Sequence, residues 1–78
     1  MKTMTCRELG GACDEAFHAN TFEEMADLSR WHGMKMHEAG DPAHLEAMQD
    51  MQALMKAPDE MQKWFESRRQ AFEDLPDD

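Results

Sequence analysis

The chain contains two cysteines and, further along, two histidines whose order and spacing suit one metal site. Six residues separate Cys6 from Cys13, and four separate His32 from His37. Two thiols and two imidazoles are a complete tetrahedral ligand set for Zn²⁺, and structural zinc sites commonly close all four positions in this way. Zinc fingers usually place two to four residues between their thiols, so the cysteine spacing here is wider than the common one. These four residues are the predicted ligands of one zinc ion.

The spacing of the histidines places a condition on the helix that carries them. Residues five apart on a regular α-helix lie about 140° apart around its axis. His32 and His37 can therefore share a metal only if the helix widens or unwinds between them, and Gly33 is where that distortion costs least. If His37 points away, His18 is the substitute ligand. His44 is expected to face solvent.

Methionines offer a second metal chemistry. The chain has nine of them, and Met34 and Met36 lie between the two predicted histidine ligands. Thioethers and thiolates select Cu⁺, so a copper-handling protein is a chemically reasonable alternative to a zinc protein. Five other methionines lie at helical spacing, which predicts that they fill a core: Met25, Met48, Met51, Met55 and Met61.

Size and charge restrict the function classes. The 78 residues suit one small domain. A core of this size contributes only about 3–5 kcal/mol to the stability of the fold, so a bound metal ion is a common additional source of stability. The formal net charge of −9 repels phosphate backbones and argues against a nucleic acid partner. No apolar run resembles a signal sequence or a membrane span, which predicts a cytoplasmic protein with no membrane partner. In a reducing cytosol the two thiols are expected to stay free of a disulfide.

The residues around the candidate ligands predict an α+β fold. Gly10-Gly11 marks a turn, so the first twenty residues should form a short, irregular β-hairpin with the cysteines at its end. Thr21 to Glu24 has the capping-box pattern of a helix start, and that helix should run to about residue 38. Gly40-Asp41-Pro42 should end it and begin a second helix, which should run to about Lys56.

A third helix is predicted after Pro58, and it carries an aromatic stripe. Trp64, Phe65 and Phe72 recur at helical spacing and should pack against the two earlier helices. An acidic pair in its first turn and a basic pair near its end suit the helix dipole.

These elements predict one domain over residues 1–78 with two halves. Residues 1–39 should form a hairpin and helix in the ββα order of a zinc finger, and this half should bind the metal. Residues 41–75 should form a helical hairpin. Because a helical hairpin of this size cannot bury its own apolar face, it should dock on the metal-binding half or on another chain. It is the predicted surface for a protein partner or a homodimer.

Part of the chain resembles a bacterial family of small proteins of unknown function, catalogued as predicted small metal-binding proteins. The resemblance spans roughly residues 4–39 and rests on these features: Cys6-Arg7-Glu8-Leu9-Gly10, Cys13, the helix start at Thr21–Glu24, and His32-x4-His37. It implies a metal site made by the two cysteines and the two histidines, and it brings no established activity. Gly11, Gly33 and the helices after residue 40 depart from the family pattern.

Two functions follow from these features. The leading prediction is a small zinc-binding protein with a structural site and a helical interaction surface. The alternative is a metal-handling protein, a copper or zinc buffer or chaperone, that uses cysteine, histidine and methionine ligands. No enzyme is predicted, since the sequence lacks a Ser/His/Asp order and a four-ligand zinc leaves no open position for substrate. Trp31 adjoins His32 and should report metal removal.

Overall fold

The computed structural model describes residues 1–78 and confirms the α+β fold. The elements in chain order are β1 (Lys2–Thr5), the 3₁₀ turn η1 (Arg7–Leu9), β2 (Ala16–Ala19), α1 (Phe22–Ala39), α2 (Pro42–Met55) and α3 (Pro58–Asp74). The predicted hairpin and the three predicted helices are therefore present, and the helix ends differ from the predicted ones by only a few residues. None of the helices combines the length and the apolar character that a bilayer-spanning segment needs.

The hairpin buries one face because its register places the apolar residues together. β1 pairs antiparallel with β2, and Met4 lies opposite Phe17. Residues directly opposite each other point to the same side of an antiparallel pair. Met4, Phe17 and Ala19 are all buried, whereas His18 on the other face is exposed. Nδ1 of His18 and the Thr3 hydroxyl are hydrogen-bonded at 2.9 Å on that outer face.

The helix boundaries follow the capping residues. The Thr21 hydroxyl accepts a hydrogen bond from the Glu24 amide and begins α1, and Gly40 ends it in the left-handed conformation at φ 71°. The Asp41 carboxylate then accepts from the His44 amide and begins α2, with Pro42 in the first turn. This short sequence of caps reverses the chain between the two helices, so the start of α2 is held close to the end of α1.

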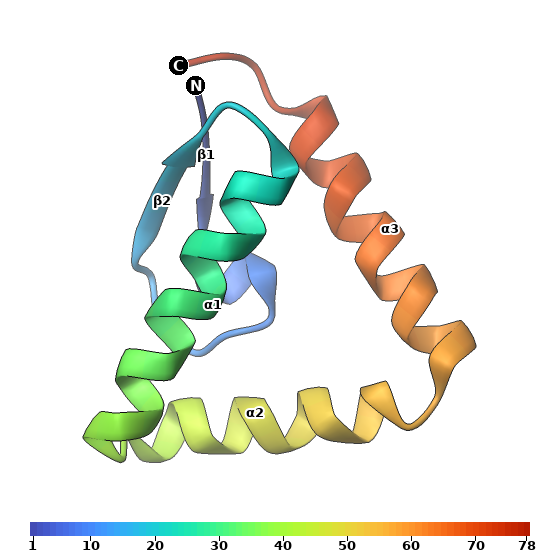
Figure 1. The fold of residues 1–78 in the computed structure, drawn as a ribbon. Coiled ribbons are helices and arrows are strands. Elements are labelled where there is room, and N and C mark those ends of the chain that lie inside the picture. The colour runs from blue at the N-terminus through green and yellow to red at the C-terminus, as the bar shows by residue number, and fades with distance from the viewer.

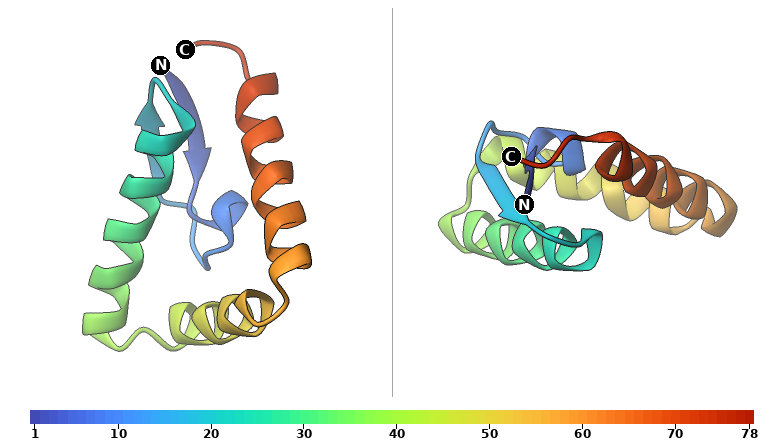
Figure 2. Two further views of the ribbon diagram at one scale, coloured as in Figure 1. Left: turned by 45° about the vertical axis from the view of Figure 1, so that its right-hand side comes forward. Right: turned by 90° about the horizontal axis from the view of Figure 1, so that it is seen from above.

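The three helices form three sides of an open frame (Figure 1). β1 and η1 lie between α1 and α3, and β2 lies behind α1 (Figure 2, left). The molecule is thin, with principal extents of 33 × 29 × 15 Å (Figure 2). The structure differs here from the predicted helical hairpin at 41–75. α2 and α3 meet at a wide angle, and α3 runs back along the hairpin toward the N-terminus instead of lying beside α2. The difference arises because the aromatic stripe of α3 packs on β1 and the start of α1.

That aromatic packing forms the main core. Phe22 at the start of α1 contacts Phe65 and Phe72 of α3 edge to face, with ring centroids 5.3 and 5.9 Å apart. Phe72 is 3% exposed, and it joins Met4 and Met25, both fully buried, in one cluster. Only 9 of the 78 residues are buried. This small core leaves little reserve of stability, so each of its members should matter.

We expect Phe72→Ala to destabilise the fold by about 3–5 kcal/mol, because it removes a buried ring and leaves a cavity. The measurement is urea unfolding followed by circular dichroism. Leu28→Ala is the control, since Leu28 is 39% exposed and its truncation should cost less than about 1 kcal/mol. Equal midpoints for the two variants would show that α3 does not hold the core.

Candidate metal centre

The two cysteines lie in the turn between β1 and β2, which we call the cysteine knuckle (residues 6–13). Backbone hydrogen bonds fix its shape: the Cys6 amide donates to the Glu15 carbonyl, the Arg7 amide to the Cys13 carbonyl, and the Gly11 amide to the Cys6 carbonyl. A Cβ atom at Gly11 would lie 2.1 Å from the Cys6 sulfur. Glycine is therefore required there, because the backbone passes too close to the thiol for any side chain.

Gly10 has a separate reason to be glycine. Its φ of +93° lies in the left-handed region, which L residues rarely adopt. The side chains of Met51 and Trp64 also cover it, at 2.7 and 3.0 Å from the position that a Cβ would take. The knuckle is thus packed under residues from both α2 and α3. Both glycines of the Gly10-Gly11 pair serve the geometry of this turn.

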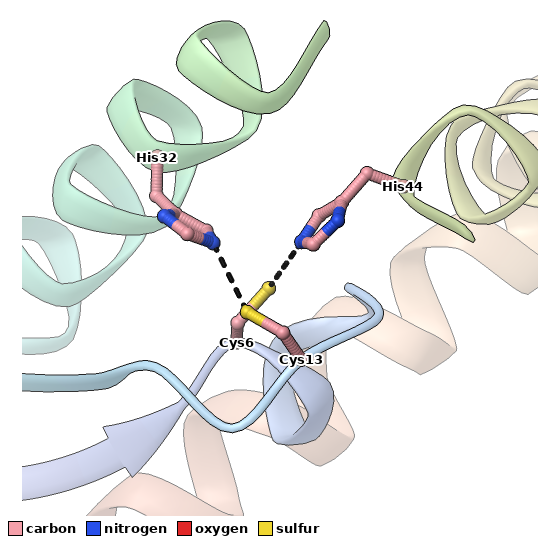
Figure 3. A group of neighbouring side chains, drawn as sticks. All are labelled: Cys6, Cys13, His32 and His44. Carbon is pink, nitrogen blue, oxygen red and sulfur yellow. Dashed lines mark hydrogen bonds between the residues drawn. The ribbon is translucent and has the colours of Figure 1, made fainter. Parts of the chain in front are cut away.

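Four side chains converge on one point in front of the knuckle: Cys6, Cys13, His32 and His44 (Figure 3). Their ligand atoms all lie within 4.8 Å of one another. The Cys13 sulfur is 3.2 Å from Nε2 of His32, and the Cys6 sulfur is 3.6 Å from Nε2 of His44. Zinc–ligand distances of about 2.0–2.3 Å in a tetrahedron place neighbouring ligand atoms about 3.3–3.8 Å apart. The cluster fits such an ion with only a small contraction, and it can hold a metal ion.

The structure brings together three of the four predicted ligands and corrects the fourth. His37 is exposed on α1 and lies outside the cluster, and His44 takes its place. The prediction that His44 faces solvent is wrong, because it is 4% exposed. α1 is an uninterrupted helix that includes Gly33, so the widening that His37 needed does not occur. The reversal at Gly40 instead returns the chain so that His44 faces His32.

The substitute ligand, His18, is also outside the cluster. It lies on the exposed face of β2, where its ring is 3.5 Å from the Asp78 carboxylate. The alternation of the strand decides this placement, because Phe17 and Ala19 occupy the buried face. His18 is therefore directed away from the knuckle.

Asp41 orients His44 for coordination through Nε2. Its carboxylate lies 2.6 Å from Nδ1 of His44 and also accepts the His44 backbone amide at 2.9 Å. The hydrogen bond from the His44 side chain lowers the pKa of Asp41 below its usual value, so the carboxylate is ionised and can only accept. Nδ1 must then carry the proton, which leaves the lone pair of Nε2 facing Cys6. A carboxylate behind a histidine is the usual outer partner of a metal-bound imidazole.

The surroundings of Cys6 act on its thiol in two opposite directions. Burial raises the pKa of Cys6, although the backbone amides of Cys13 and Ala12 hydrogen-bond to its sulfur and act in the opposite direction. Amide donors around a sulfur are suited to a thiolate, and burial disfavours the thiolate when no positive charge is near. A bound cation would supply that charge, since metal-ligating thiols are deprotonated.

The ring of His32 is held by aromatic neighbours rather than by a carboxylate. Phe17 meets it edge on, with centroids 5.5 Å apart, and the His44 ring meets it at 5.3 Å. The ligands thus come from the knuckle, from α1 and from α2, which are three separate parts of the chain. The four candidate ligands therefore extend beyond the predicted half at 1–39.

A sequence signal for His44 exists in the spacing Asp41-x-x-His44. An N-cap carboxylate lies next to the third residue of its helix, because it accepts the amide of that residue. A histidine at this position can reach the same carboxylate with Nδ1. The pattern therefore predicts an oriented histidine at a helix start, directly after the glycine that reverses the chain.

No family model, curated protein or solved structure matches this chain. The metal site is accordingly supported by the four side chains and their hydrogen-bond partners alone.

We expect Asp41→Asn to lower the affinity for metal by about 10–100-fold, because the negative charge that makes the His44 imidazole a stronger ligand is lost. Asparagine caps a helix as well as aspartate does, so the helical circular dichroism signal should be unchanged. The measurement is competition for Zn²⁺ with a chromophoric chelator. Asp27→Asn removes the same charge from an exposed residue of α1 and is the control. Equal affinities for the two variants would exclude a role for Asp41 in the site.

Proposed function

We propose that this protein binds one Zn²⁺ through Cys6, Cys13, His32 and His44, and that the ion is structural. The observation that carries the proposal is the convergence of four ligand atoms from three separate elements to within 4.8 Å. Two thiolates and two imidazoles in a compact cluster are typical of tetrahedral zinc. Zinc bound there would join the knuckle, α1 and α2 through one ion.

The size of the core supports a structural role. Only nine residues are buried, and a core of this kind contributes about 3–5 kcal/mol. Structural zinc in small domains contributes about 10–16 kcal/mol of apparent binding free energy. The ion would therefore be the larger source of stability. Four protein ligands leave no position for a substrate, so we propose no enzymatic activity.

The free thiols suit a reducing compartment, and we propose the cytosol. The resemblance of residues 4–39 to small metal-binding proteins agrees with metal binding. Membership of that family stays a prediction, since no family model matches. We further propose that the helices carry a surface for a protein partner, because much of their apolar surface is exposed. Leu28, Trp31, Met34 and Met55 are each at least 39% exposed.

We expect native mass spectrometry of protein purified without added metal to find one zinc ion per chain. His44→Ala should lose most of that metal, whereas His37→Ala and His18→Ala should retain it, because only His44 lies in the cluster. Cys6→Ser is the positive control for loss. Retention of metal by His44→Ala together with loss in His37→Ala would contradict the ligand set. A native copper load would favour the alternative, a copper-handling protein.

We expect chelation to shift the emission of Trp64 to the red more than that of Trp31. Trp64 packs over Gly10 of the knuckle, so loosening the knuckle exposes it. Trp31 is already 57% exposed, with the Lys35 ammonium 5.2 Å from its ring centroid. This reverses the expectation drawn from the adjacency of Trp31 and His32. The single-tryptophan variants Trp31→Phe and Trp64→Phe separate the two signals, and unchanged spectra after verified metal removal would contradict a structural role.

A further inference from the structure

A cavity of about 430 Å³ lies beside the metal centre, between the knuckle, α1 and α2. We call it the methionine groove, because Met34, Met48 and Met51 line it together with Leu9. Its volume lies in the range of sites that take a ligand or a partner's side chain. Methionine surfaces are flexible and polarisable, and they adapt to apolar partners of varied shape. One wall is formed by Cys6 and His44, so the metal centre fixes the shape of the groove.

Gly33 keeps part of this groove open. It lies inside α1, where glycine costs about 0.5–1 kcal/mol relative to alanine. Packing does not require glycine there, because an added Cβ would meet only the Met48 methyl group, at an ordinary contact distance of 3.6 Å. Its backbone is also regular helix and not the left-handed conformation of Gly10 and Gly40. The space next to Gly33 is therefore left free although the fold alone would favour a side chain.

The accessible surface of the chain is larger than its size predicts. It is 5336 Å², whereas a folded monomer of 9.0 kDa exposes roughly 4,900 Å². The excess agrees with the thin shape and with the exposure of Met34, which is 53% accessible at the groove. A partner seated on the groove would cover this surface.

The charges around the groove indicate which partner. The groove lining itself carries one carboxylate, Glu38, and one guanidinium, Arg30, besides His37 and His44; Arg30 is paired with Asp27. The excess of negative charge lies outside the lining: the chain has 17 acidic and 8 basic residues, and α2 carries Glu46 and Asp50 but no lysine or arginine. A second copy of this chain would bring another charge of −9, which opposes association. A basic partner is electrostatically complementary, and such complementarity favours both encounter and selectivity.

We propose that the methionine groove binds a basic amphipathic helix of a partner protein. One large apolar side chain of that helix enters the groove between Met34, Met48 and Met51. The lysines and arginines of the helix face the surface outside the groove, on a chain whose formal net charge is −9. Helices bind grooves in this way through apolar residues spaced three and four apart. The inference rests on the proposed function, because the zinc ion would hold the walls in place.

The test uses zinc-loaded protein and a fluorescein-labelled peptide of about 18 residues. The peptide carries leucines and one tryptophan on one helical face and lysines elsewhere. Fluorescence anisotropy should give a Kd of about 10 μM or tighter. A peptide with glutamates in place of the lysines, and a basic peptide of scrambled order, should each bind at least about tenfold more weakly. Added salt should weaken the binding of the basic peptide.

A matched pair of variants locates the binding surface. Met34→Gln replaces an exposed methionine of the groove and should weaken binding about tenfold. Met55→Gln makes the same change at a methionine that is 59% exposed and does not line the groove, and it should bind as the unmodified protein does. Gly33→Leu fills the groove and should also lose about tenfold in affinity, while the helical signal and the metal content stay unchanged.

Four results would overturn the inference. The first is no binding of the basic peptide to zinc-loaded protein, and the second is equal binding of the acidic peptide. The third is an equal loss in Met34→Gln and Met55→Gln. The fourth is a dimer in sedimentation that Met34→Gln dissociates, which would assign the groove to a second copy instead. The metal count of the same sample separates the two proposals, since missing zinc contradicts the proposed function and missing peptide binding to loaded protein contradicts only this inference.

Discussion

The contact between the cysteine knuckle and the start of α2 is the constraint on which the other elements depend. The Cys6 sulfur faces Nε2 of His44 at 3.6 Å, and both residues are almost fully buried. The two residues are 38 positions apart in the sequence, and their contact joins the start of α2 to the hairpin. His44 is the only buried residue of α2, so this contact is the most deeply buried attachment of α2 to the rest of the molecule. The knuckle is in turn possible only because Gly11 leaves room for the sulfur.

The sequence was sufficient to predict the elements and most of the site, for reasons that lie in local chemistry. Thr21 and Asp41 are caps that bond to backbone only three residues away, so helix starts could be inferred from neighbours in sequence. The pairing of Cys6 with Cys13 followed from a turn that Gly10-Gly11 marks. The choice between His37 and His44 was different in kind. It depended on the direction of α2 after the reversal at Gly40, which is a tertiary feature.

The wrong choice had a specific physical origin. The sequence-based prediction accepted a distorted helix so that His32 and His37 could share a metal. A regular helix retains all its backbone hydrogen bonds, whereas a distorted helix loses some of them. A ligand that needs no distortion is therefore favoured over His37. His44 was within reach because the end of α1 and the start of α2 are joined by a tight turn. The predicted helical hairpin at 41–75 differs from the structure for a related reason. Phe65 and Phe72 of α3 pack on Phe22 of α1 and not on α2.

Asp41 shows how two requirements at one position narrow the sequences that this fold accepts. Thr21 only caps a helix, so serine, aspartate or asparagine could replace it at little cost. Asp41 caps a helix and also accepts the Nδ1–H of His44, and an anionic acceptor raises the basicity of the imidazole as a ligand. Serine would cap α2 and leave the imidazole free to rotate, asparagine would satisfy the geometry without the charge, and glutamate would reach the imidazole but cap poorly. Aspartate alone therefore combines the cap, the reach and the charge at residue 41, although each of these roles by itself would tolerate several residues.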